Sequence, residues 1–163
     1  MKRIRFGGFL LYCMLGTVGV RASIPTTATP EPSHSLPFDL GEVEKAQSRC
    51  AVCGMPIAAH SKLSYIAHEG KHSFILCSFA CAHKFKSAKP SYELFARDFM
   101  TGQAALAEGL YFLTHSHAIQ NEVEFGMEPL VVAFIHKNDA QATQRRLGDG
   151  KVVTSYEQLE KLF

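Results

Sequence analysis

Four of the five cysteines lie in two close pairs, and this spacing is the first feature of the sequence that indicates chemistry. Two residues separate Cys50 from Cys53, and three separate Cys77 from Cys81. Two thiol pairs on either side of a predicted hairpin are typical of a metal-binding knuckle. Met55 follows two residues after Cys53 and adds a thioether, which Zn²⁺ does not need and Cu(I) favours. The pattern predicts a metal site with soft ligands.

Two other interpretations of the cysteine pairs stay open at this stage. In an oxidising compartment the four cysteines would form two disulfides, and cysteines are also ordinary core residues. The spacing favours a metal ion over both. Catalysis has little support, because the sequence contains no Gly-rich phosphate loop, HExxH motif or GxSxG motif. We therefore expect a metal-binding protein that is not an enzyme.

A second soft donor lies far along the chain. The dipeptide Gly126-Met127 repeats the dipeptide Gly54-Met55. If the two halves of the protein face each other, Met127 would join Cys53 and Met55 in a three-coordinate site for Cu(I). The alternative is that Met127 fills a gap in the core.

Histidines supply further candidate ligands. His115 and His117 alternate, so both imidazoles would lie on one side of a strand; we favour two solvated loop histidines instead. Four more histidines crowd the cysteine stretch: His60, His68, His72 and His83. His83 follows Cys81 by two residues, which makes a mixed Cys/His site an alternative.

The elements that would position the cysteines follow from the same stretch. Residues 63–67 alternate between apolar and polar, residues 73–76 form an extended run, and a turn separates them. This pattern predicts a β-hairpin. Ser78 is suited to cap a short helix that ends before Lys89-Pro90. The hairpin would then deliver Cys77, and the first turn of the helix would hold Cys81 on the same side.

The rest of the chain alternates short strands and short helices. We predict a strand at 93–99, a helical segment at 103–108, a strand at 110–113, an apolar strand at 130–135 in the centre of a sheet, a helix ending at Leu147, a strand at 151–154 and a C-terminal helix. Capping boxes at Asn138-x-x-Gln141 and Ser155-x-x-Gln158 would open the last two helices. The composite is an α+β fold.

Residues 1–22 have the sequence of an export signal, with a basic start and an apolar run interrupted by glycines. The alternatives are an uncleaved membrane anchor or a lipid attached at Cys13. Each of these options places the rest of the chain outside the cytoplasmic membrane. We therefore expect an exported, periplasmic protein of a bacterium, with a membrane tether as the alternative to cleavage.

Charge and composition distinguish the first 22 residues, a proline-rich segment and a C-terminal domain. Four of the 17 basic residues and none of the 15 acidic ones lie in residues 1–22, so the rest has a net charge of −2. That balance excludes a nucleic-acid-binding surface. The proline-rich composition of residues 23–48 predicts a flexible tether. Residues 49–163 form the predicted metal-binding domain, with candidate units at 49–99 and 100–163.

These motifs, in this order, resemble the NosL family, the copper accessory proteins of nitrous oxide reductase. The resemblance covers about residues 49–163: Cys-x-x-Cys-Gly-Met at 50–55, Asp98-Phe-Met-Thr-Gly in mid-chain, and Gly126-Met127 followed by a strand, a helix and a Gly-x-Gly turn. It implies two small related strand/helix units of the MerB/NosL-like fold. It also implies a Cu(I) carrier that serves nitrous oxide reductase or its assembly machinery, with Cys53, Met55 and Met127 at the family's soft-ligand positions.

Residues 50–92 also resemble the TRASH/YHS group of small metal-binding domains, and here the second pair, Cys77 and Cys81, carries the resemblance. This resemblance implies a different site, in which Cys50, Cys53, Cys77 and Cys81 hold Zn²⁺ or a heavy metal for sensing or stability. A further option is that the protein binds both copper and zinc, at separate sites. The relationship of NosL to the organomercurial lyase also implies a lyase-like enzyme as a remoter alternative.

Overall fold

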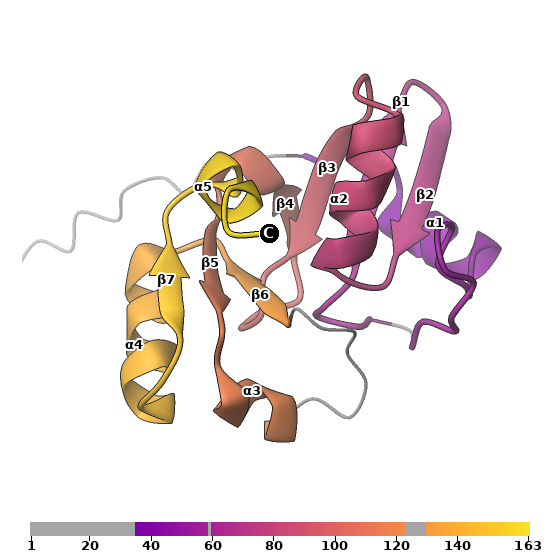
Figure 1. The fold of residues 1–163 in the computed structure, drawn as a ribbon. Helices are drawn as coiled ribbons and strands as arrows, with labels where there is room; N and C mark the ends of the chain where they lie inside the picture. The colour runs from indigo at the N-terminus through magenta and orange to yellow at the C-terminus, as the bar shows by residue number, and fades with distance from the viewer. Residues whose placement is uncertain (1–34, 59, 123–129) are drawn as a thin grey trace, which may run out of the picture. The chain divides into compact units, whose positions relative to one another are not determined.

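The computed structural model describes residues 35–58, 60–122 and 130–163 (Figure 1). The predicted signal peptide, residues 23–34 of the predicted tether and Met127 lie outside these ranges. The described residues form two antiparallel sheets and several helices, which confirms the predicted α+β class. None of the helices in these ranges has the length and apolar character that a membrane crossing requires.

The first sheet is built around a hairpin. β1 (Tyr65–Glu69) and β2 (His72–Leu76) pair antiparallel across a tight turn, in which Gly70 has a φ of +60° that favours glycine. β3 (Glu93–Arg97) pairs with the other edge of β1, and β4 (Ala104–Leu106) pairs with β3. The strand order is β2-β1-β3-β4, and the predicted hairpin is confirmed.

The helix α2 (Phe79–Ala88) connects β2 to β3 and covers one face of this sheet (Figure 1). Ser78 is its N-cap, as predicted, and the helix ends just before Lys89-Pro90. Phe79 and Phe85 are buried on its inner side. The helix therefore starts at the point where β2 leaves the sheet.

The second sheet is formed by the C-terminal third of the chain. A short 3₁₀ helix, η1 (Ala107–Gly109), leads into β5 (Tyr111–Thr114). β6 (Val131–Phe134) and β7 (Lys151–Val153) pair with opposite edges of β5. α4 (Lys137–Leu147) connects β6 to β7, and the strand order is β6-β5-β7.

The two sheets repeat one topology, in agreement with the two strand/helix units of the predicted fold class, but the first sheet includes β4 and so extends beyond the predicted boundary at residue 99. In each, the first strand is central, the next two flank it, and a helix joins the second strand to the third. The second unit adds α3 (His117–Glu122) before β6 and α5 (Tyr156–Glu160) after β7. The repeated dipeptides do not mark equivalent places, because Gly54 precedes the first strand of its unit and Gly126 precedes the second strand of the other.

One hydrophobic cluster joins both sheets. From the first unit it takes the inner residues of β1 and α2, including Tyr65 and Phe79, and from the second it takes Phe112, Val153 and Leu159. A smaller cluster lies under α4. Because period-two alternation sends neighbouring side chains of a strand to opposite faces, β5 contributes to both clusters.

The turn after β3 also ties the two units together. The buried carboxylate of Asp98 accepts hydrogen bonds from the backbone and hydroxyl of Thr101, and from the backbone N–H of Ile135. The N–H of Phe99 donates to the carbonyl of Ala133 at 2.7 Å. These bonds cover the outer side of β6, so the strand is buried although it lies at the edge of its sheet. The prediction that residues 130–135 form a central strand is therefore wrong.

Two further predictions differ from the structure. The segment 103–108, predicted as helical, contains β4, because the turn held by Asp98 places it beside β3 and pairing overrides helix propensity. α4 begins at Lys137 with His136 as its N-cap, so Asn138 lies inside the helix and does not cap it. Ser155 does cap α5, as predicted.

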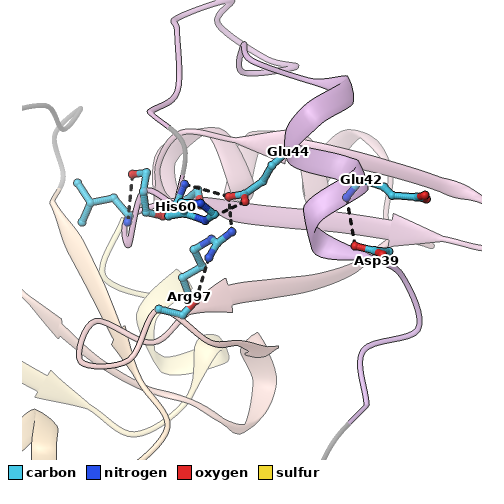
Figure 2. A network of polar contacts seen from close by, with 9 residues as sticks. Asp39, Glu42, Glu44, His60 and Arg97 are labelled. Carbon is cyan, nitrogen blue, oxygen red and sulfur yellow. Dashed lines mark hydrogen bonds and ion pairs between the residues drawn. The ribbon is translucent and has the colours of Figure 1, made fainter.

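The helix α1 (Leu40–Ala46) lies within the segment predicted as a tether. Asp39 caps it by accepting a hydrogen bond from the N–H of Glu42 (Figure 2). Just before it, the ring of Phe38 packs on His68 and Phe95 at 4.8 and 5.1 Å between ring centroids. These contacts lie on the face of the first sheet opposite α2, and the folded part of the chain therefore begins before residue 49.

A buried ion pair fastens α1 to the sheet. The carboxylate of Glu44 contacts the guanidinium of Arg97 at the end of β3, and both side chains are at most 9% exposed. His60 adds a contact to the same carboxylate at 3.1 Å, and Arg97 also donates to the carbonyl of Gly102 (Figure 2). No local pattern marks Glu44, because its partner lies 53 residues away.

Candidate metal centre

The first cysteine pair lies in a tight turn that hydrogen bonds close. The N–H of Cys50 donates to the carbonyl of Met55, and the N–H of Gly54 donates to the carbonyl of Cys50, both at 2.9 Å. Gly54 has a φ of +73°, a backbone conformation that favours glycine. The chain thereby folds back after Cys53, and the two thiols of the pair lie near each other.

The sheet holds this turn in place. The N–H of Ala51 donates to the carbonyl of Ile75 at the end of β2, at 3.0 Å. The side chain of Gln47 bonds to β2 as well, accepting from the N–H of Ile75 and donating to the carbonyl of Ser73. The guanidinium of Arg49 donates to the carbonyl of Gly54 at 3.0 Å. These bonds fix the first pair beside the end of β2.

The second pair is positioned by the junction of β2 and α2. Cys77 follows the last residue of β2, and Cys81 lies in the first turn of α2. The hydroxyl of Ser78 accepts a hydrogen bond from the N–H of Cys81 at 3.5 Å, which fixes that turn. The sulfurs of Cys77 and Cys81 are 3.6 Å apart.

The four sulfur atoms form one group. All of them lie within 4.8 Å of one another, and those of Cys53 and Cys77 are 3.5 Å apart. Tetrahedral metal–thiolate bonds of about 2.3 Å would separate neighbouring sulfurs by about 3.8 Å. None of these four cysteines forms a disulfide. The arrangement can therefore hold one metal ion with little movement.

The group has a closed side and an open side. Cys50 and Cys81 are each 3% exposed, Cys77 is half-buried, and Cys53 is exposed. The two buried thiols pack in the main hydrophobic cluster. An ion held here would be shielded from water on the side of Cys50 and Cys81 and reachable from the side of Cys53.

The four thiols differ in how readily they ionise. Burial opposes a charge on Cys50, but hydrogen bonds from the backbone N–H groups of Cys53, Cys77 and Val52 lower its pKa to about 7. Burial raises the pKa of Cys81 to about 11. Burial and the neighbouring thiols also raise the pKa of Cys77. A metal ion that binds this group would therefore displace protons from Cys77 and Cys81.

The structure describes Met55, one of the two predicted methionine ligands. Met55 lies at the end of the first turn, two residues after the exposed Cys53, and is 39% exposed. Met127 lies outside the described residues, so the three-coordinate site of Cys53, Met55 and Met127 stays a prediction. The structure brings together Cys50, Cys53, Cys77 and Cys81.

Two histidines near the cysteines, His68 and His83, contact other groups. His68 is buried and shares a hydrogen bond with the hydroxyl of Ser73 at 2.9 Å. His83 lies 3.3 Å from the carboxylate of Glu160 and stacks on Phe79. Among the described residues, the group of candidate metal ligands contains cysteines alone. The alternative of a mixed Cys/His site therefore has no support from the geometry.

Sequence reasoning missed one residue that shapes the site. Gln47 was assigned to the tether, yet its amide bonds to both the carbonyl of Ser73 and the N–H of Ile75. No local signal marks Gln47, because these bonds depend on where β2 lies in the folded chain.

The fold has a known counterpart. No protein-family model and no curated protein matches the sequence. Among solved structures, the copper chaperone NosL from Shewanella denitrificans is similar over 78% of this chain and 96% of its own, with a TM-score of 0.53 and 18% sequence identity. The predicted resemblance in fold is thereby confirmed, and this chain has the fold of the copper chaperone NosL.

Proposed function

We propose that this protein is a non-catalytic copper carrier that binds one Cu(I) ion at the four-cysteine group and passes it to an acceptor protein. The observation that carries this proposal is the gathering of four sulfur atoms within 4.8 Å. Thiolates are soft ligands that select Cu(I) over hard cations. The likeness in fold to a copper chaperone supports the same function.

The asymmetry of the group suits a carrier. Cys50 and Cys81 lie in the core and keep water from one side of the ion, while Cys53 faces solvent. An acceptor thiol or thioether can approach only from the open side, where it would replace Cys53 first. The ion would then leave by stepwise ligand exchange, and the thioether of Met55 would be a weak additional ligand of the bound ion.

The client and the compartment belong to the proposal as well. We propose nitrous oxide reductase or its assembly machinery as the client, because the sequence resembles the NosL family. Export follows from the basic and apolar pattern of residues 1–22, which predicts a periplasmic protein with or without a membrane tether.

A second candidate function is a zinc or heavy-metal domain, in which the group serves stability or sensing. The observation that favours it is the number of thiols, because four sulfurs at near-tetrahedral spacing are the usual ligand set of structural Zn²⁺. In this case Met55 would have no role in binding.

Anaerobic titration of the reduced protein distinguishes these functions. Wild type, Met55→Leu and Met100→Leu are titrated with Cu(I) against a competing chelator, after zinc and free thiols have been quantified. Met100 is a matched control because it is also an exposed methionine, in another turn. A copper carrier binds one Cu(I) tightly and loses about tenfold in affinity in Met55→Leu alone. Co-purified zinc that Cu(I) does not displace would instead support the zinc domain.

A further inference from the structure

The exposed thiol of Cys53 contacts a thiol of the other cysteine pair. The sulfur of Cys53 lies 3.5 Å from that of Cys77, although 24 residues separate them in sequence. Cys53 is exposed and Cys77 half-buried, whereas Cys50 and Cys81 are each only 3% exposed. An oxidant in solution therefore meets Cys53 first and finds Cys77 beside it.

We propose that Cys53 and Cys77 are a site of reversible disulfide formation, and that the metal-free protein is oxidised across the two cysteine pairs and not within them. The oxidant is a small-molecule disulfide. The thiolate of Cys53 attacks one of its sulfurs, forms a mixed disulfide and releases one small thiol. The thiol of Cys77 then passes its proton to the departing small thiolate and attacks the sulfur of Cys53, which forms the protein disulfide and releases the second small thiol. Two protein thiols are oxidised, and one external disulfide is reduced to two thiols.

The geometry favours this pair over its competitors. A disulfide bond is about 2.0 Å long, so the sulfurs of Cys53 and Cys77 must approach by about 1.5 Å. Cys53 is exposed, so its side chain can rotate toward Cys77 while the backbone of its turn stays hydrogen-bonded. Cys81 is almost as close to Cys77, at 3.6 Å. Its thiol is buried in the main cluster, however, and its backbone is bonded to the hydroxyl of Ser78.

The consequence for metal binding rests on the proposed function. A bond between Cys53 and Cys77 removes two of the four sulfur donors and leaves Cys50 and Cys81 buried behind it. The oxidised protein would not accept an ion, and a bound ion would protect the thiols from oxidation. Loading would then depend on a reductant that reopens the bond.

Tryptic cleavage allows a direct test of the connectivity. Cleavage after Arg49 and Lys62 places Cys50 and Cys53 in one peptide, and cleavage after Lys71 and Lys84 places Cys77 and Cys81 in another. The chelator-treated, folded protein is oxidised with oxidised glutathione, alkylated, digested without reductant and analysed by mass spectrometry. The proposal predicts that the peptides 50–62 and 72–84 are joined, with fragment ions that assign the bond to Cys53 and Cys77.

Single variants provide the controls, with folding checked by circular dichroism. Cys53→Ser and Cys77→Ser should lose the joined peptides by at least tenfold, while Cys50→Ser and Cys81→Ser should retain them. Separate peptides with internal bonds, or glutathione left on Cys53, would overturn the proposal. The connectivity is measured without metal, so its failure leaves the copper proposal standing, and a failure of copper binding leaves the disulfide map unchanged.

Discussion

At the scale of single residues, the protonation of the thiols determines how metal affinity depends on pH. The pKa of Cys50 is lowered to about 7 by backbone hydrogen bonds, against the effect of burial. The pKa values of Cys77 and Cys81 are raised, by burial first of all. Near neutral pH the group therefore holds at least two protons that must leave when an ion binds.

The first prediction follows from these directions. Loading with Cu(I) at pH 7.5 should release at least two protons, those of Cys77 and Cys81 among them, so the apparent affinity should rise at least about 100-fold per pH unit. Below pH 7 the dependence should steepen, because Cys50 also becomes protonated. A pH indicator in weakly buffered anaerobic solution measures the release. Binding with no release would contradict the assignment of these thiols as ligands.

A second prediction concerns the ion pair between Glu44 and Arg97. Glu44→Gln leaves a buried guanidinium without its charged partner, which should lower the free energy of unfolding by about 3 kcal/mol. Glu157→Gln is the matched control, because Glu157 pairs with Lys161 at a site where both side chains are at least 70% exposed. The control should cost far less, because water already screens this exposed pair. Urea unfolding measures both, and equal losses would show that the buried pair has no special role.

At the scale of elements, the site depends on three segments that meet at the end of β2. The hairpin delivers Cys77, the N-cap of α2 fixes Cys81, and hydrogen bonds from Ala51 and Gln47 hold the first turn against Ile75. The hairpin and the cap follow from local sequence patterns. The role of Gln47 does not, because it depends on a strand 28 residues away.

The third prediction tests this role. Gln47→Ala leaves the N–H of Ile75 without its partner, a loss of about 1–2 kcal/mol in local stability. Amide hydrogen exchange in residues 50–54 should speed up about tenfold or more, and the metal affinity should fall with it. Lys45→Ala is the control, since Lys45 is an exposed residue of the same helix. Unchanged exchange in Gln47→Ala would show that the turn is held without the side chain of Gln47.

Other elements show where sequence patterns mislead. Residues 103–108 have helix-forming side chains but pair with β3, because Asp98 and Gly102 fold the chain back there. The strand 130–135 is fully apolar, which suggested a central position. Instead this strand lies at the edge of its sheet, and Phe99 and Asp98 of the first unit hydrogen-bond to its outer side. No local sequence pattern predicts this contact between the units.

At the scale of the whole molecule, two units of the same topology share one hydrophobic cluster, and α1 covers the outer face of the first. The order of motifs along the chain predicted the two units and the fold class. The start of the folded domain is not predictable from local sequence, because α1 is too short to be stable with its Asp39 cap alone. It depends on the pairing of Glu44 with Arg97 and on the packing of Phe38 against Phe95.

The fourth prediction is a comparison of two truncated chains. A chain starting at residue 35 should keep the stability of the folded part, while a chain starting at residue 49 loses Phe38, Glu44 and Gln47 together. The shorter chain should unfold at a temperature at least 10 °C lower, or fail to fold, because the buried charge of Arg97 is left unpaired. Calorimetry measures the difference, and equal melting temperatures would mean that α1 is indeed only a tether.

The central claim is that the four cysteines hold one ion of Cu(I), and X-ray absorption spectroscopy of the copper-loaded protein tests it most directly. The account predicts one copper per chain, in the Cu(I) state, with sulfur neighbours only at about 2.3 Å. Cys53→Ser should lower the number of these neighbours, and Cys77→Ser should do the same. A first shell of nitrogen or oxygen, or copper bound equally well without these cysteines, would contradict it.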